Sequence, residues 1–90
     1  MLKTLENLIK LARERKISPL EGSYTNKLLN DKLLSKSKVL EEVDELIEAV
    51  EENFNKIHEA ADVLYHLLMY LEANDIKIED VMLELEKRKK

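Results

Sequence analysis

The first third of the chain places apolar residues at the spacing of an amphipathic helix. Leu5 and Ile9 lie one turn apart, as residues on one helical face do. Pro19 and Gly22 then interrupt the pattern, because neither residue suits the interior of a helix. This part is therefore predicted to contain a helix over residues 2–16, a loop over residues 17–25, and a short segment over residues 26–34 whose pattern also permits a helix.

Two longer helices are predicted in the middle of the chain. The first runs from about Ser37 to Asn53, with Ser35 or Ser37 as its cap, because a serine hydroxyl accepts a hydrogen bond from a free amide of the first turn. The second covers residues 56–73, and the short connection near residues 53–55 predicts an antiparallel hairpin. The apolar stripe of the first helix comprises Val39, Val43, Leu46, Ile47 and Val50.

The length and composition of the chain suit one helical domain. Asn74 and Asp75 form a predicted turn before a last helix over residues 79–89. The 90 residues are 44% hydrophobic and include one Gly, one Pro and no Cys, so neither a disulfide framework nor a thiolate metal site is available. The predicted fold is all-α, a single domain over residues 1–90 with four to five helices in an antiparallel bundle.

Charge and hydropathy exclude several classes of protein. The net charge of -4 argues against a general nucleic-acid binder, which would present a basic surface. No apolar stretch reaches the roughly 18 residues of a membrane span, and the first residues lack the pattern of a signal peptide. We therefore expect a cytoplasmic protein without nucleic-acid or membrane partners.

The helix predicted over residues 56–73 is apolar nearly all round. A helix of this kind is normally buried on every side, and 90 residues can hardly bury one. We therefore expect a homodimer that covers this helix. Against the apolar background, Glu59, Asp62 and His66 fall within about 60° of one another at ~100° per residue and form one polar stripe.

The preceding helix carries a matching acidic stripe. Glu42 and Glu45 are three residues apart, and Glu41 and Glu45 are four apart, so all three share one surface. Packing them against Glu59 and Asp62 would crowd negative charges that repel one another. A hard divalent cation resolves this conflict, and Mg²⁺ prefers carboxylate and water oxygens while leaving positions for phosphates. The pattern therefore predicts a metal site for phosphate chemistry.

Other interpretations of these residues stay open. A pair of glutamates on one helical face is most often solvated surface, and the whole chain can be a non-enzymatic helical oligomerisation module whose carboxylates pair with Lys and Arg. The module would bind no Mg²⁺. His66 alone suits a hydrogen-bonded core or interface residue better than a ligand, although a supporting role behind the metal ligands is also open.

The acidic motifs resemble those of a known superfamily. EEVDE at Glu41–Glu45 and EAAD at Glu59–Asp62 are similar to the EExxE…ExxD signature of the all-α nucleoside triphosphate pyrophosphohydrolases, which include MazG-type enzymes. Three further segments resemble the phosphoribosyl-ATP pyrophosphohydrolase family of histidine biosynthesis. They are EGSYT at residues 21–25 with Arg15 before it, EAADVLYHLL at residues 59–68, and EDVMLELEKR at residues 79–88.

The resemblance implies an activity and a set of partners. The expected reaction is hydrolysis of the α–β phosphoanhydride of phosphoribosyl-ATP to phosphoribosyl-AMP and pyrophosphate by water. It is expected to need Mg²⁺, with Mn²⁺ as a substitute, and to be performed by a homodimer. A cyclohydrolase acts next in this pathway and is expected on a separate chain. The alternative within the superfamily is a MazG-type enzyme acting on free nucleoside triphosphates.

The resemblance also assigns roles to individual residues. Its metal ligands would be Glu42, Glu45, Glu59 and Asp62, and Glu41 or Glu45 would be the general base. The substrate would be bound by Arg15, Ser23, Tyr24, Thr25 and Lys38. The chain departs from the family pattern at four places. Leu40 stands where Gly usually precedes the glutamate pair, and Ser37–Lys38 where two lysines are usual. The stretch from the SYT segment to the glutamate pair is about one residue short, and Pro19 lies one place earlier than in the family.

Overall fold

The computed structural model describes residues 2–89, and these residues form five helices. Within this range there is no strand, so the prediction of an all-α fold with four to five helices is confirmed. None of the described helices is long and apolar enough to cross a membrane. The helices are α1 (Lys3–Ile17), α2 (Tyr24–Asn30), α3 (Lys32–Glu52), α4 (Lys56–Ala73) and α5 (Ile78–Arg88).

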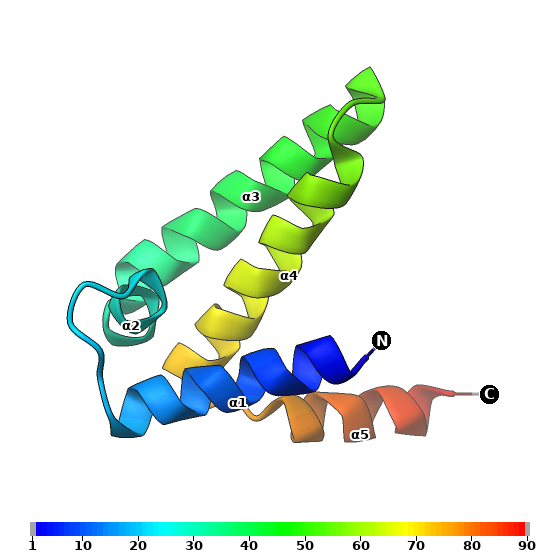
Figure 1. Cartoon of the computed structure of the whole chain (residues 1–90). Coiled ribbons are helices and arrows are strands. Elements are labelled where there is room, and N and C mark those ends of the chain that lie inside the picture. Colours follow the sequence, from blue (N-terminus) through cyan, green and yellow to red (C-terminus); the bar gives the residue numbers. More distant parts are fainter. Residues whose placement is uncertain (1, 90) are drawn as a thin grey trace.

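The α3–α4 hairpin dominates the architecture (Figure 1). It extends to one side, while α1 and α5 lie across the other end of α4 and α2 fills the corner between α1 and α3. The hairpin turns through Asn53 and Asn55, both in the left-handed region with φ of 53° and 60°. Asparagine tolerates this conformation better than most residues. The predicted hairpin, its turn and the bounds of α4 are confirmed.

The start of α3 differs from the prediction. The helix begins at Lys32, five positions before Ser37, and neither Ser35 nor Ser37 is its cap. Asp31 takes that role, because its side chain accepts a hydrogen bond of 3.0 Å from the amide of Leu34. The same aspartate also ends α2, so the two helices meet at one residue and no loop separates them.

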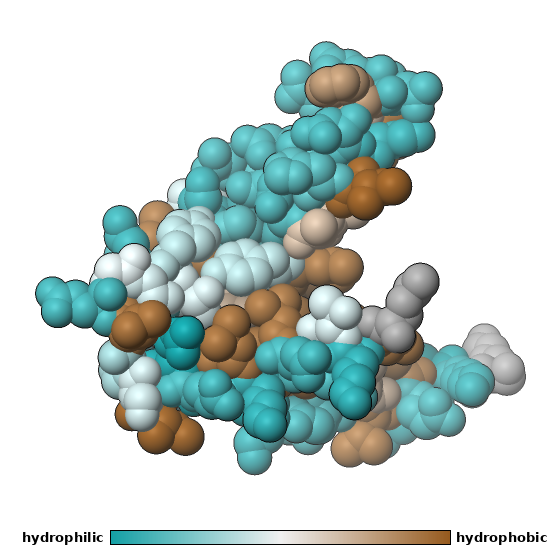
Figure 2. Space-filling model, viewed as in Figure 1, coloured by the Kyte–Doolittle hydropathy of each residue, from teal (hydrophilic) through white to brown (hydrophobic). Residues whose placement is uncertain are grey.

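The small core lies where α1, α2 and α4 meet. Leu28 and Met69 are fully buried there, beside Ala12. Apolar side chains fill the recess between the hairpin and α1, whereas the upper part of the hairpin is hydrophilic on the face seen in Figure 2. Burying few large residues leaves little hydrophobic stabilisation for a single copy.

An ionic cluster joins α1 to both ends of the α4–α5 connection. Arg13 donates two hydrogen bonds, of 2.6 and 2.8 Å, to the Glu79 carboxylate and a third to the buried Glu72. Lys16 binds the carbonyl oxygen of Glu72 at 2.8 Å and the Asp75 carboxylate at 2.9 Å. Since α5 has no buried residue, this cluster is a principal attachment of α5 to the rest of the chain.

The chain is open for its size. It exposes 6947 Å², whereas a folded monomer of this mass typically exposes about 5,500 Å². An apolar groove of about 1140 Å³ runs between α1, α4 and α5. The predicted apolar stripe of α3 is also largely exposed at Val43, Ile47 and Val50. The buried residues of α3 are instead Ser35, Glu42 and Ala49.

Replacing the residue shared by α2 and α3 tests the observed start of α3. We expect Asp31→Ala to lower the free energy of unfolding by about 1 kcal/mol, because the first turn of α3 loses its acceptor. Urea denaturation at one fixed protein concentration measures this loss. Ser37→Ala is the matched control and should not lower stability, because Ser37 is exposed inside the helix, where Ala is the better helix former. A larger loss in Ser37→Ala than in Asp31→Ala would contradict the assigned helix start.

Candidate metal and phosphate site

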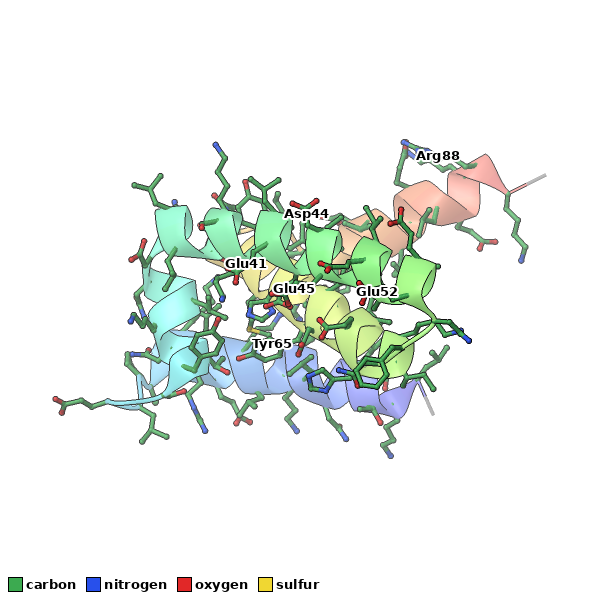
Figure 3. All side chains as sticks on the ribbon, turned by 90° about the horizontal axis from the view of Figure 1, so that it is seen from above. Glu41, Asp44, Glu45, Glu52, Tyr65 and Arg88 are labelled. Atoms are coloured by element: carbon green, nitrogen blue, oxygen red, sulfur yellow. The ribbon has the colours of Figure 1, made fainter. Side chains whose placement is uncertain are left out.

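Three acidic residues of α3 gather on the side of the helix that faces α4. One carboxylate oxygen from each of Glu41, Glu42 and Glu45 lies within 4.8 Å of the others. Glu41 and Glu45 point to the same side of α3, and Asp44 points away from them (Figure 3). Glu42 is only 6% exposed. The spacing predicted from the sequence therefore brings these three side chains together.

A second group faces them from the first two turns of α4. Glu59 and Asp62 each place a carboxylate oxygen within 4.8 Å of a ring nitrogen of His58. Charges on the two helices interact across the hairpin. The charge of Glu45 raises the pKa of Glu59, and the charge of Asp62 raises the pKa of Glu42. We call the five carboxylates on the two helices the carboxylate array, namely Glu41, Glu42, Glu45, Glu59 and Asp62.

Two carboxyl groups of the array, those of Glu42 and Glu59, have raised pKa values. Burial raises the pKa of Glu42, and the neighbouring Glu45 raises it further. Burial also raises the pKa of Glu59, followed by the charge of Glu45 across the hairpin. In both residues Oε2 is buried and has no hydrogen-bond partner among the described residues. A buried, unpartnered carboxylate oxygen is costly, and a divalent cation with oxygen ligands would satisfy both. The donor set therefore fits Mg²⁺.

His66 lies next to the array and has a partner for each ring nitrogen. Its Nδ1 donates to the backbone oxygen of Asp62 at 2.8 Å, because a carbonyl oxygen can only accept. Its Nε2 then accepts from the Tyr24 hydroxyl, also at 2.8 Å. The side chain is 6% exposed. His66 thus connects the backbone at Asp62 to the start of α2.

The hydroxyl groups of the SYT segment form contacts within the protein. Ser23 caps α2 by accepting a hydrogen bond from the amide of Asn26 at 3.3 Å. Thr25 is hydrogen-bonded to the hydroxyl of Tyr65. The Tyr65 ring stacks with Tyr24 at a centroid distance of 6.3 Å. These side chains hold α2 against α4, beside the array.

The two basic residues predicted to bind phosphate lie in different surroundings. Lys38 is one turn before Glu41 on α3 and forms an ion pair of 3.1 Å with it. Arg15 lies half-buried in the last turn of α1, and among the described residues it forms no hydrogen bond or ion pair with the array. The structure therefore places Lys38 at the array and gives Arg15 no contact there.

Two groups of the structure have contacts that the sequence did not predict. His58 pairs with Asp62, and its spacing of four residues was a usable signal, because residues four apart share a helical face. Arg13 and Glu72 are 59 positions apart, and no local pattern connects residues at such a separation. His58 therefore lies beside the carboxylate array. Arg13 and Glu72 belong to the ionic cluster that attaches α5.

Comparison with known proteins identifies the family of the chain, which the geometry of the site does not. Residues 2–89 match the family model described as phosphoribosyl-ATP pyrophosphohydrolase. A phosphoribosyl-ATP pyrophosphatase of Clostridium acetobutylicum is 43% identical over 93% of this chain and 79% of its own length. One of Listeria innocua is 45% identical over 98% of this chain and 84% of its own length.

Some relatives are much longer than this chain. The histidine biosynthesis bifunctional protein HisIE of Pyrococcus furiosus is 43% identical over the whole chain, which spans only 42% of that protein. No solved structure gives a significant match. The family model covers nearly every residue, including all the motifs that form the array and the segment beside it. The chain therefore belongs to the phosphoribosyl-ATP pyrophosphohydrolase family.

Proposed function

We propose that the chain hydrolyses the α–β phosphoanhydride of phosphoribosyl-ATP, releasing phosphoribosyl-AMP and pyrophosphate, in the cytoplasm and with Mg²⁺ as cofactor. One structural observation carries the metal dependence. The Oε2 atoms of Glu42 and Glu59 are buried without partners on facing helices, an arrangement that is stable only with a proton or a cation. Membership of the phosphoribosyl-ATP pyrophosphohydrolase family supports phosphoribosyl-ATP as the substrate.

The residues of the array would divide the work of the reaction. Glu42, Glu45, Glu59 and Asp62 would hold the cation, which supplies charge neutralisation for the phosphates. Glu41 or Glu45 would accept the proton of the attacking water, and Glu41 is exposed to solvent. Neither Cys nor a Gly-rich phosphate loop is present, so attack by water suits this chain better than a covalent intermediate.

The substrate would enter beside α2. Lys38 is placed to bind a phosphate oxygen in exchange for its ion pair with Glu41. Ser23, Tyr24 and Thr25 form the neighbouring wall, and we propose that they contact the substrate through the groups left free by their internal hydrogen bonds. Arg15 would reach the phosphates only after movement of its side chain.

A homodimer is part of the proposal. The excess exposed area of about 1,500 Å², relative to a typical monomer of this mass, exceeds the roughly 800 Å² that each partner buries in a standard interface, so one chain has enough surface for a stable interface. The groove presents Leu67 of α4, 39% exposed, and Leu83 of α5, 62% exposed. A second copy would cover these side chains.

Two competing functions make different predictions. A MazG-type enzyme would prefer free nucleoside triphosphates, and a helical oligomerisation module would neither bind Mg²⁺ tightly nor hydrolyse any of these compounds. Turnover of phosphoribosyl-ATP beside a panel of free nucleotides, with and without EDTA, separates the three. Faster turnover of free nucleotides would support the MazG-type function, and tight Mg²⁺ binding in calorimetry would exclude the module.

Substitutions in the array should strongly lower turnover without unfolding the chain. We expect Glu45→Gln and Asp62→Asn to lower kcat by about 10²–10⁴-fold, because each removes a cation ligand or the proton acceptor. Release of pyrophosphate measures the rate, and far-UV circular dichroism checks the fold. Asp44→Asn is the matched control, since Asp44 is exposed on the opposite side of α3. Near-normal turnover in both array variants would rule out this site.

When no metal is present, the pH dependence of stability should show the raised pKa of Glu42. The folded pKa of Glu42 is raised, so the native chain holds this proton more tightly than the unfolded chain. Its contribution is full below the unfolded value of about 4.5 and is lost as the pH rises through the folded pKa. In EDTA, Glu42→Gln should therefore gain stability relative to the unchanged chain as the pH rises above this value. Parallel curves of urea midpoint against pH would contradict this.

The state of association tests the proposed dimer. We expect sedimentation equilibrium at micromolar concentration to give twice the mass of 10.6 kDa. Leu67→Lys should shift the protein toward monomer, because it places a charge in the apolar groove. Leu20→Lys changes an exposed apolar residue of the loop before α2 and should leave the mass unchanged. A monomeric unchanged chain would refute the dimer, and an unaffected Leu67→Lys dimer would place the interface elsewhere.

A further inference from the structure

The partners of His66 fix the direction of a short chain of hydrogen bonds that ends at Tyr24. The carbonyl oxygen of Asp62 can only accept, so Nδ1 of His66 carries the hydrogen of their 2.8 Å bond. In a neutral imidazole the other nitrogen, Nε2, then has no hydrogen and accepts. The hydroxyl of Tyr24, also 2.8 Å away, therefore donates its single hydrogen to His66. The Tyr24 oxygen can offer a further partner only a lone pair.

The Tyr24 side chain is accessible and is held in one orientation. The residue is 45% exposed, and among residues 2–89 its hydroxyl has no hydrogen-bond partner besides His66. Its ring stacks on Tyr65 at a centroid distance of 6.3 Å and meets the edge of His66 at 5.7 Å. Desolvation raises the pKa of Tyr24, the charge of Lys38 lowers it, and the charge of Glu42 raises it. The hydroxyl therefore lies close to the charged groups of α3.

We propose that Tyr24 is a specificity-determining residue, whose oxygen accepts a hydrogen bond from a hydroxyl group of the ribose that carries the triphosphate. The inference rests on the proposed function and adds to it the atom of Tyr24 and the substrate group that meet. A charged phosphate oxygen is itself an acceptor, so it gains nothing from an oxygen whose hydrogen is already engaged. A sugar hydroxyl supplies the missing donor. The neighbouring Lys38 offers donors and no acceptor, so it suits the phosphates.

The other two hydroxyl groups of the SYT segment differ from Tyr24 in this respect. Ser23 accepts its hydrogen bond from the amide of Asn26, so its own hydrogen can still be donated to a phosphate oxygen. Thr25 and Tyr65 can each be the donor of the bond that they share, so the direction of that bond is not fixed. Tyr24 is therefore the hydroxyl of this segment that the protein presents as an acceptor.

Nuclear magnetic resonance of the imidazole nitrogens tests the direction of the hydrogen bonds in the full chain. At about pH 8, where an imidazole is ordinarily neutral, we expect His66 to carry a hydrogen on Nδ1 and none on Nε2. The chain has two histidines, so His58→Gln assigns the remaining signals to His66. A hydrogen on Nε2 of His66 would let the Tyr24 hydroxyl donate to a phosphate and would overturn the proposal.

Analogues of phosphoribosyl-ATP that lack the 2′- or the 3′-hydroxyl of this ribose test the partner of the Tyr24 oxygen. We expect one analogue to lower kcat/KM of the unchanged chain about two- to tenfold, the contribution of one neutral hydrogen bond. Tyr24→Phe should hydrolyse that analogue and phosphoribosyl-ATP equally well. Because this is a ratio of two substrates, a loss of stability in the variant cancels.

Tyr70→Phe is the matched control for the substrate ratio. It removes the hydroxyl of another tyrosine, half-buried on α4, which has no hydrogen-bond partner among residues 2–89. This variant should keep the full preference for the ribose hydroxyl. The proposal is overturned if Tyr24→Phe retains the preference, or if the unchanged chain hydrolyses both analogues as well as phosphoribosyl-ATP.

Inhibition by pyrophosphate distinguishes a sugar contact from a phosphate contact. Lys38→Gln should weaken this inhibition at least about tenfold, because it removes a charged donor, whereas Tyr24→Phe should leave it unchanged. Equal weakening in the two variants would identify Tyr24 as a phosphate ligand and overturn the proposal. An unchanged chain that fails to hydrolyse phosphoribosyl-ATP refutes the proposed function and this inference with it. Turnover without a preference for either ribose hydroxyl refutes the inference alone.

Discussion

Repulsion between carboxylates on two facing helices is the constraint on which the rest of this structure depends. An ordinary helical hairpin packs apolar side chains between its helices, but the buried residues of α3 are Ser35, Glu42 and Ala49. The hairpin therefore gains little hydrophobic stabilisation where it has the most contact. Buried carboxylate oxygens without partners are costly, so a stable fold needs contributions from elsewhere.

Those contributions come from the opposite end of α4. The core of α1, α2 and α4 fixes one end of the hairpin, and the bonds of Tyr24 and Thr25 to His66 and Tyr65 place α2 beside the array. The apolar stripe that an ordinary hairpin would bury is instead left outside on α3. The hairpin thus has buried carboxylates between its two helices and an exposed apolar stripe on its outer side.

Local signals predicted the hairpin well and the start of α3 poorly. Asparagines flank α4 and mark its bounds, and the spacing of Glu42 and Glu45 put both on one face. The cap at Asp31 was not predicted because this one residue ends α2 and begins α3. No loop residues lie between the two helices to mark the boundary in the sequence. The apolar stripe of α3 was visible, but periodicity alone cannot tell which face of a helix is buried. Contacts between distant residues, such as Arg13 with Glu72, leave no local pattern at all.

Leu40 shows how the structure changes the meaning of a departure from the family pattern. In the sequence it stands directly before the glutamate pair, where the family usually has Gly, and a side chain there would be expected to crowd the array. In the structure Leu40 is 62% exposed within a regular helix. It lies on the same exposed side as Val43 and Ile47, three and seven residues later. The substitution therefore enlarges the apolar outer stripe of α3 and leaves the carboxylates unobstructed.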